Sequence, residues 1–226
     1  MKREIIKTED GSKTIRIIEL EENYHSIHGA LQEANHVFMK YGLEEFKHKN
    51  ELRILEMGFG TGLNTCLTAI NSKDLKVNIE YHGIEAFPVS QIELDELEYG
   101  SLLGEENRDL YNQLHLVEWN QSIEIYKGFN LKKIHSEIQN IELQNEFYDI
   151  VFYDAFGPRV QNELWSEEVF QKMFNSLKTG GFLVTYCAKG QVKRNMKAVG
   201  FTVEVLPGPP GKREMTRAWK KYQPQP

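Results

Sequence analysis

The sequence predicts an α/β protein with a doubly wound, mainly parallel sheet of seven strands. Short runs rich in β-branched and aromatic residues alternate with amphipathic stretches through residues 49–222. The first of these runs leads into a glycine-rich turn and then into an expected helix. Only a Pro/Gly-rich turn at 207–211 separates the last two runs, which predicts an antiparallel C-terminal hairpin.

The elements are expected in the following order. Strands are predicted at residues 52–57, 79–85, 114–117, 148–154, 182–187, 201–206 and 215–220. Helices are predicted at 63–70, 89–97, 106–113, 165–177 and 191–199, with an irregular helical segment at 122–140. Residues 1–48 are expected to form a small N-terminal extension, a hairpin turning at Asp10-Gly11 and a helix from Gly29 to about Tyr41. Residues 49–222 form the expected Rossmann-like domain.

Composition excludes several classes of protein. No apolar run approaches the ~18–20 residues that a membrane span needs, and the first residues lack the apolar core of a signal peptide. Cys66 and Cys187 stand far apart, outside any CxxC or metal-type spacing, so reduced cytoplasmic thiols are expected. No His/Cys cluster indicates a metal site.

Charge is distributed unevenly along the chain. The formal net charge is −6, but residues 187–226 carry +7, which leaves −13 on the preceding part. Such an asymmetry can place a basic patch on one side of an acidic molecule, although a solvated C-terminal surface would look the same.

The strongest local signal is a glycine-rich turn between a strand and a helix. A dinucleotide fingerprint, GxGxxG, would need a glycine at its sixth position counted from Gly58, and Leu63 stands there. The GxGxG spacing with an acid before it instead favours S-adenosylmethionine, which has no pyrophosphate for the helix N-terminus. The cofactor-binding candidates in this turn are Glu56, Gly58, Gly60, Gly62 and Asn64.

Further candidates follow other strands. Glu85 ends the second strand beside the glycine turn, where its carboxylate can accept both ribose hydroxyls. One of Glu118, Trp119 and Asn120 after the expected third strand would hold the adenine, although Trp119 could equally belong to the core. Asp154 follows the fourth strand, so its carboxylate and the Phe156 ring should face the same crevice as the glycine turn.

In combination, these motifs resemble one family. The matching segments are Tyr24-His-Ser26, Gly29-Ala-Leu-Gln-Glu33, Leu55 to Asn64, Tyr153-Asp-Ala-Phe156, Glu163-Leu-Trp165 and Gly208 to Met215. Together they are similar to the MnmC/MnmD methyltransferases over nearly the whole chain. Gln161-Asn162 stands where that family tends to have Asn-Pro.

The resemblance implies a class I methyltransferase fold and a reaction on the tRNA wobble uridine. S-adenosylmethionine would methylate 5-aminomethyl-(2-thio)uridine to 5-methylaminomethyl-(2-thio)uridine, with Asp154 and Phe156 at the reacting amine and Asp154 also near the cofactor. The fused form of the family adds a flavin-dependent oxidase domain, for which 226 residues are too few.

The resemblance also implies contacts with the tRNA anticodon loop. A flipped base would stack on aromatic rings, for which Phe156, Tyr24 and Phe59 are candidates. Phosphates would be bound by basic side chains of the C-terminal part, namely Lys189, Lys193, Arg194, Lys212, Arg213 and Arg217.

Three other interpretations remain open from the sequence. An enzyme of the same fold could methylate a small-molecule amine. A non-catalytic module could bind S-adenosylmethionine or RNA, against which the Asp154-Ala-Phe156 segment argues. An NAD oxidoreductase is disfavoured by Leu63 and by the terminal hairpin.

Overall fold

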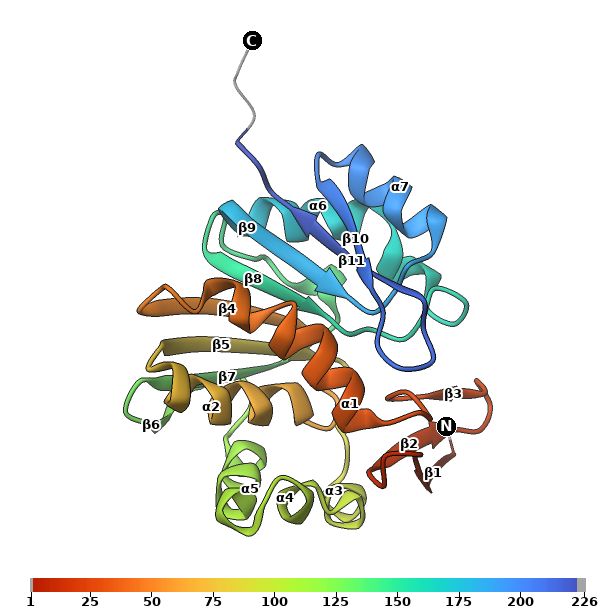
Figure 1. The fold of residues 1–226 in the computed structure, drawn as a ribbon, viewed down its shortest axis with the longest axis vertical. Helices are drawn as coiled ribbons and strands as arrows, with labels where there is room; N and C mark the ends of the chain where they lie inside the picture. The colour runs from red at the N-terminus through yellow and green to blue at the C-terminus, as the bar shows by residue number, and fades with distance from the viewer. Residues whose placement is uncertain (1, 223–226) are drawn as a thin grey trace.

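One eight-stranded sheet organises the chain, which the computed structural model describes over residues 2–222 (Figure 1). The strand order is β10-β11-β9-β8-β4-β5-β7-β6. Strands β4, β5, β7, β8 and β9 are parallel, and the outer strands are antiparallel. The bounds are β4 (Glu51–Met57), β5 (Asn78–Glu85), β6 (Ser122–Tyr126), β7 (Phe129–His135), β8 (Tyr148–Tyr153), β9 (Leu177–Thr185), β10 (Thr202–Pro207) and β11 (Glu214–Trp219).

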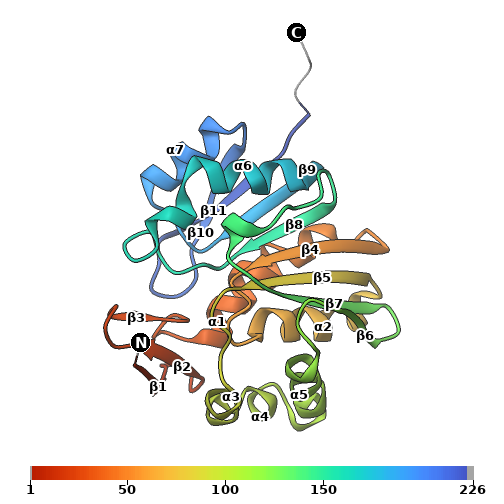
Figure 2. The same ribbon diagram turned by 180° about the vertical axis from the view of Figure 1, so that it is seen from behind.

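Helices cover both faces of the sheet, as the doubly wound prediction requires (Figures 1 and 2). One face packs against α1 (Ala30–Ala34), the π-helical segment η1 (Asn35–Lys40), α2 (Leu63–Leu75) and α5 (Arg108–Leu116). The other face packs against α6 (Glu167–Ser176) and α7 (Gly190–Ala198). Neighbouring residues of one strand serve opposite cores, as Ile54 and Leu55 do on β4. The central strands are therefore apolar on both faces.

The predicted third strand and the predicted helical segment after it were wrong. Residues 114–117 lie in and just after the last turn of α5, and 122–140 contains β6, β7 and the 3-10 turn η4 (Ile138–Asn140). Strand β7 alternates correctly, but its third core-facing position is Lys133, which is buried. Lys133 Nζ donates to the main-chain oxygen of His115 at 2.7 Å. This charged residue hid the period-2 hydrophobic pattern of β7 in the sequence. Strand β6, which was also not predicted, raises the number of strands in the sheet from seven to eight.

The C-terminal hairpin is confirmed. Strands β10 and β11 pair antiparallel from Thr202↔Trp219 to Pro207↔Glu214. Strand β11 lies between β10 and β9, antiparallel to both, so the hairpin closes one side of the sheet. This arrangement distinguishes the fold from the all-parallel dinucleotide-binding sheet.

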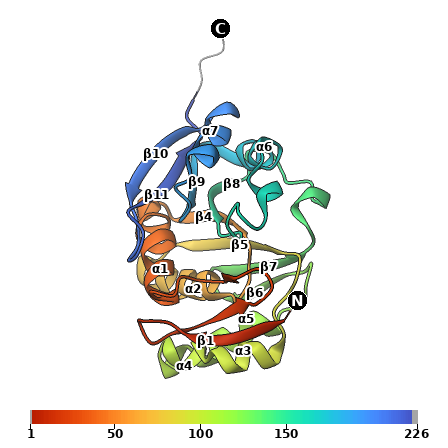
Figure 3. The same ribbon diagram turned by 90° about the vertical axis from the view of Figure 1, so that its right-hand side faces the viewer.

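The first residues form a separate three-stranded antiparallel sheet (Figure 3). Its strands are β1 (Arg3–Lys7), β2 (Lys13–Ile17) and β3 (Glu22–Asn23), and the predicted hairpin pairs Ile5 with Ile15 around Asp10-Gly11. The segment that follows, α1 and η1, packs into the main core. The division of the chain at residue 48 stays a prediction.

Shorter elements complete the connections. They are α3 (Gln91–Leu97), α4 (Tyr99–Leu102) and the 3-10 turns η2 (Leu43–Phe46), η3 (Glu105–Asn107) and η5 (Asn162–Trp165). Within residues 2–222, no helix combines the length and apolar character that crossing a membrane demands.

Candidate active site

The candidate site lies where the order of the strands reverses. The chain runs from β4 to β5 and β7 on one side of β4, and then returns to β8 and β9 on the other side. In open α/β sheets, ligands bind at such a switch point, outside the carboxyl ends of the strands. The glycine turn follows β4 and Asp154 follows β8, so both reach this crevice.

Gly58 allows these two strand ends to touch. Its φ is +91°, and a Cβ on Gly58 would lie 2.6 Å from the main-chain oxygen of Asp154. The main-chain N–H of Asp154 donates to the oxygen of Met57 at 2.9 Å. Any side chain at position 58 would therefore push Asp154 away from the turn.

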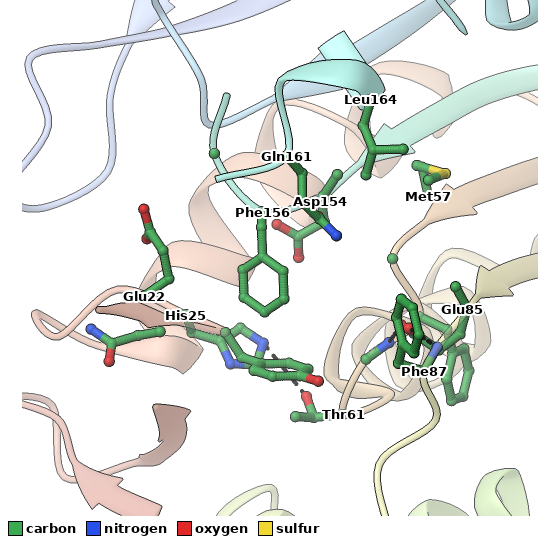
Figure 4. A pocket seen from close by; sticks show the side chains of 18 of the residues that line it. Glu22, His25, Met57, Thr61, Glu85, Phe87, Asp154, Phe156, Gln161 and Leu164 are labelled. Atoms are coloured by element: carbon green, nitrogen blue, oxygen red, sulfur yellow. Dashed lines mark hydrogen bonds between the residues drawn. The ribbon is translucent and has the colours of Figure 1, made fainter. Parts of the chain in front are cut away.

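A cavity of about 510 Å³ occupies the crevice (Figure 4). This volume lies within the usual range for small-molecule sites. The glycine turn and the ends of β5 and β8 form one side of the cavity, and residues 22–27 of the N-terminal segment form the opposite side.

Basic side chains hold the N-terminal segment across the cavity. Arg3 Nη2 donates to the main-chain oxygen of Phe87 at 3.2 Å, beyond the end of β5. Arg159, in the loop after β8, donates to the main-chain oxygen of Leu20 at 2.9 Å. The three N-terminal strands thus contribute to a wall of the site.

Glu85 is held in a fixed orientation by two main-chain donors. Its Oε2 accepts from Gly60 N–H and its Oε1 accepts from Phe87 N–H, both at 2.9 Å. Each carboxylate oxygen keeps a further acceptor position, and Glu85 lines the cavity. A carboxylate held in this way can accept two neighbouring hydroxyls, as the sequence predicted for ribose.

None of the adenine candidates at 118–120 lines the cavity. Trp119 does not line the cavity; its ring packs against Phe59 at 5.9 Å, with the ammonium of Lys133 4.9 Å from its centroid. The strand beside β5 is β7, so the loop after β7 occupies the corresponding place. Ser136, Glu137 and Gln139 line the cavity there. These residues were not among the predicted candidates because the third strand was expected at 114–117 rather than at β7.

The polar residues that flank the glycines have different positions. Asn64 lines the cavity, whereas Glu56 is fully buried behind the turn and does not. Gly60 also lines the cavity, but Gly62 packs inward, where a Cβ would lie 2.9 Å from the His115 ring. Of the predicted cofactor contacts in the turn, Gly58, Gly60 and Asn64 therefore reach the cavity.

Asp154 lines the cavity next to the glycine turn. Its Oδ2 accepts from Asn64 Nδ2 at 2.8 Å. Burial raises the pKa of Asp154 to about 7, and the nearby charge of Glu33 adds to the effect, while Asn64 and Lys212 oppose it. Near neutral pH this carboxyl group can therefore hold or release a proton.

Two aromatic rings face each other beside Asp154. Phe156 and Tyr24 are edge to face, with 5.0 Å between their centroids and 86° between their planes. Both line the cavity, as the sequence predicted for base-stacking candidates. Phe59, the third candidate, also lines the cavity, but it is largely buried and its ring packs against the Gly83 backbone and Trp119.

Two side chains outside the Asp154-Ala-Phe segment fix its backbone. Trp165 Nε1 donates to the main-chain oxygen of Phe156, and the Tyr186 hydroxyl donates to that of Ala155, both at 2.8 Å. Trp165 belongs to the Glu-Leu-Trp motif, which explains why that motif accompanies the loop. Tyr186 was missed by the sequence analysis because it follows β9 without any recognisable motif.

The predicted phosphate-binding residues separate into three groups. Lys189, Arg194 and Arg213 are exposed. Lys193 is half-buried beside Glu214. The two others, Arg217 and Lys212, are engaged in ion pairs. Arg217 is buried and ion-paired with Glu45 and Glu204.

Lys212 points inward rather than toward solvent. Its Nζ lies 2.5 Å from Oε2 of Glu33 and 3.9 Å from the centroid of the Tyr186 ring. Both Lys212 and Glu33 line the cavity. Glu33 ends the Gly29-Ala-Leu-Gln-Glu33 motif, to which the sequence assigns no role. The pairing with Lys212 could not be predicted, because only the fold brings α1 next to the β10–β11 turn.

His25 also lines the cavity and is not exposed to solvent. It is buried, and burial lowers its pKa to about 4, so the ring is neutral at physiological pH. Its nearest polar neighbours are the hydroxyls of Thr14, Tyr99 and Thr61, at 3.4–3.5 Å from the ring nitrogens.

The cavity is acidic. Within residues 2–222, two cationic side chains line it, Arg3 and Lys212, beside the neutral His25. The lining carboxylates are Glu22, Glu33, Glu85, Glu137, Asp154 and Glu163. Such a lining favours positively charged ligand groups over anionic ones.

These features fit S-adenosylmethionine. Glu85 is oriented for the ribose hydroxyls, and the carboxylate lining suits a sulfonium and an ammonium group. A Cβ on Gly60, whose φ is +49°, would lie 3.3 Å from the Tyr24 ring and narrow the cradle between turn and wall. Fold and site together define a class I S-adenosylmethionine-dependent methyltransferase.

Comparison with known proteins identifies the family. Residues 104–221, just over half of the chain, match the model described as S-adenosyl-L-methionine-dependent methyltransferase. The chain belongs to this family.

Several relatives resemble most of the chain. It is 28% identical to the tRNA 5-methylaminomethyl-2-thiouridine biosynthesis bifunctional protein MnmC of Hydrogenovibrio crunogenus, over 85% of this chain and 30% of that protein. It is 30% identical to the protein of the same name from Cupriavidus metallidurans, over 90% of this chain and 33% of that protein. The chain thus spans about a third of the length of these relatives.

Solved structures agree with the fold. The crystal structure of MNMC2 from Aquifex aeolicus superposes with a TM-score of 0.78 at 27% identity, covering 100% of this chain and 72% of that one. Spermidine synthase from Thermotoga maritima superposes with a TM-score of 0.57 at 12% identity, over 96% of this chain and 67% of that one, a likeness of fold alone.

Proposed function

We propose that this protein methylates the amino group of 5-aminomethyl-(2-thio)uridine at the wobble position of tRNA. The observation that carries the proposal is the position of Asp154, which touches the glycine turn and lines an acidic cavity. The resemblance to the MnmC proteins supports this choice of substrate.

An amine substrate fits the charge of the cavity. An alkylamine has a pKa near that of lysine, about 10.4, so it arrives mostly as an ammonium ion. Asp154 and Glu33 both line the cavity and can attract this ion. An anionic acceptor would instead meet a surplus of carboxylates.

Methyl transfer requires the amine to lose a proton first. Bound S-adenosylmethionine supplies a methyl group activated by its sulfonium. Asp154 holds the ammonium through its free oxygen positions, aims the nitrogen and accepts one proton as a neutral acid. The nitrogen lone pair then forms the N–C bond while the C–S bond breaks, leaving a thioether and a secondary ammonium. Because Asp154 has a raised pKa, proton transfer to it costs less than transfer to an ordinary aspartate.

The exposed surface near the cavity supports a polyanionic substrate. Arg213 and Arg159 have side chains that are 94% and 56% exposed, and both Arg194 on α7 and Lys189 just before that helix are exposed. These cations can bind phosphates of the anticodon loop while the base enters the acidic cavity. Phe156 and Tyr24 would stack on that base. We place the reaction in the cytoplasm, where such a tRNA substrate is available.

The experiment combines the protein with S-adenosylmethionine and tRNA that carries 5-aminomethyl-2-thiouridine, followed by mass spectrometry of the nucleosides. The expected result is a gain of one methyl group at that nucleoside. A parallel reaction with free alkylamines distinguishes a small-molecule enzyme, and methylation of these amines alone would contradict the tRNA proposal. The Asp154→Ala variant should bind S-adenosylmethionine but lose about 10²-fold or more in kcat.

A further inference from the structure

Three buried polar atoms beside the glycine turn have no hydrogen-bond partner among the described residues. They are Oε1 of Glu56, Oδ1 of Asn64 and the hydroxyl oxygen of Tyr81. Glu56 is 0% exposed, and Asn64 and Tyr81 lie next to its carboxyl group. Unsatisfied buried polar atoms are costly, so three together at a candidate site require a physical explanation.

Two hydrogen bonds that do form restrict the possible protonation state of Glu56. Thr65 Oγ1 donates to Oε2 of Glu56 at 3.0 Å. Asn64 Nδ2 donates to Oδ2 of Asp154 at 2.8 Å, so its amide oxygen points toward the remaining neighbours. If Glu56 were ionised, its Oε1 and the Asn64 Oδ1 would be two unpartnered acceptors, and the one unpartnered donor beside them, the Tyr81 hydroxyl, could serve only one of the two.

A proton on Glu56 resolves this conflict. A neutral carboxyl group has one O–H donor, which can satisfy Oδ1 of Asn64 while Oε2 still accepts from Thr65. Burial also raises the pKa of Glu56 to about 8, and the charge of Asp154 acts in the same direction, while the polar neighbours Asn64, Tyr81 and Thr65 oppose the rise. The polar groups facing Glu56 are Asn64 and Thr65 from α2, Tyr81 from β5 and Asp154 after β8.

We propose that Glu56 acts as a neutral acid, a positioning residue that fixes the Asn64 amide so that Asp154 keeps its charge and its aim at the amine. Oε1–H of Glu56 donates to Oδ1 of Asn64, and Nδ2 of Asn64 donates to Asp154. The single negative charge of the two acids then resides on Asp154, the one that lines the cavity. This inference rests on the proposed role of Asp154.

The sequence pattern alone suggests a different role for Glu56. An acid before GxGxG was predicted to contact the cofactor, but the side chain is buried behind the turn and does not line the cavity. Its influence must therefore pass through Asn64, which does line the cavity.

The test compares Glu56→Gln with Glu56→Leu. Glutamine reproduces the donor of a neutral acid at nearly the same volume, whereas leucine removes it. We expect Glu56→Gln to keep kcat at pH 7 within about three-fold, and Glu56→Leu to lose on the order of 10- to 100-fold through misaligned Asp154. The ratio of the glutamine variant to the wild type should rise with pH above 8, because only the wild type ionises at this position. Taking the ratio at each pH cancels the titration of the substrate amine.

An infrared difference spectrum at pH 7 tests the protonation state without any substrate. Because the pKa of Asp154 is about 7, that residue is partly neutral at pH 7, so the comparison is made in the Asp154→Asn background. There the carbonyl stretch of a neutral carboxylic acid should be present with Glu56 and absent in Glu56→Gln. Asp149→Asn is the matched control, because Asp149 is a buried acid on β8 that is ion-paired with Lys49 and Lys178. Its replacement should leave the neutral-acid band unchanged.

Each outcome decides the inference. A spectrum in which Glu56 contributes no neutral-acid band overturns it, as does a Glu56→Gln variant that folds and binds S-adenosylmethionine but is as inactive as Glu56→Leu. A wild type that methylates no tRNA, with the Glu56 band present, would contradict the proposed function and leave the protonation state of Glu56 established.

Discussion

The ammonium of Lys212 lies 2.5 Å from Oε2 of Glu33, and this pair joins the β10–β11 turn to α1 across the wall of the cavity. Glu33 raises the pKa of Asp154 and Lys212 lowers it. The two charges of the ion pair therefore have opposing effects on Asp154, the proposed catalytic carboxylate. Neutralising Lys212 should raise the pKa of Asp154, and neutralising Glu33 should lower it.

The first prediction follows from this balance. Lys212→Met should move the acidic limb of the pH–rate profile to higher pH, because Asp154 then ionises later. Glu33→Gln should move the limb to lower pH. The measurement is kcat/KM against pH. Arg213→Ala is the control, because Arg213 is next to Lys212 in the chain but its side chain is exposed, so its loss should not shift the limb. Shifts of equal sign in the first two variants would contradict the charge assignment.

The second prediction concerns stability. The folded-state pKa of Asp154, about 7, lies above its ordinary value of 3.8. Its contribution to stability is complete below the unfolded pKa and is lost as pH rises toward the folded pKa. Asp154→Asn removes this loss, so its Tm should exceed that of the wild type at pH 8 by about 2–8 °C, if roughly 1–2 kcal/mol is relieved. The difference should shrink toward pH 4 in thermal unfolding without ligand.

Asp149→Asn provides the control of opposite sign. The Lys178 and Lys49 partners hold the pKa of Asp149 below its ordinary value, against the effect of burial. The carboxylate therefore stabilises the fold above the unfolded pKa, and this contribution is lost as pH falls through the folded pKa. The variant should be less stable than the wild type at pH 7, and an increased Tm would contradict the reasoning for both sites.

The third prediction tests the ribose contact. Glu85→Gln places an amide NH2 against either Gly60 N–H or Phe87 N–H, where the carboxylate accepts both. Two donors then face each other, and the side chain turns away from its present orientation. The Kd for S-adenosylmethionine, measured by calorimetry, should increase about 10- to 100-fold, since about 1.4 kcal/mol corresponds to a factor of ten. Glu118→Gln should leave the Kd unchanged, because Glu118 is exposed and does not line the cavity.

The fourth prediction concerns the exposed basic side chains. Arg213→Ala and Lys189→Ala should each raise the KM for tRNA and reduce the slope of log KM against log salt by about one. kcat at saturating tRNA should change little, since neither side chain lines the cavity. Lys47→Ala is the control, because Lys47 precedes β4 at the opposite end of the parallel strands. An equal effect from Lys47 would indicate non-specific attraction.

Much of the fold could be predicted because local signals agreed with global topology. The glycine turn after β4, the β-prone run before Asp154 and the Pro/Gly turn between β10 and β11 each have a local physical cause. The error at β7 arose where a local rule failed, since Lys133 occupies a core-facing position of a strand and finds its partner 18 residues away. That partner cannot be identified before the strands are placed.

The sequence by itself determined that a glycine turn and an acid would meet at the carboxyl ends of two parallel strands, because strand order and right-handed crossovers leave few alternatives. Only the tertiary structure decided which charges surround that acid. It turned Lys212 onto Glu33, buried Glu56 behind the turn and brought Ser136, rather than residues 118–120, to the cavity. The physical reason is that pKa values and ion pairs depend on distances of a few ångströms between residues far apart in the chain, and local sequence patterns do not encode those distances.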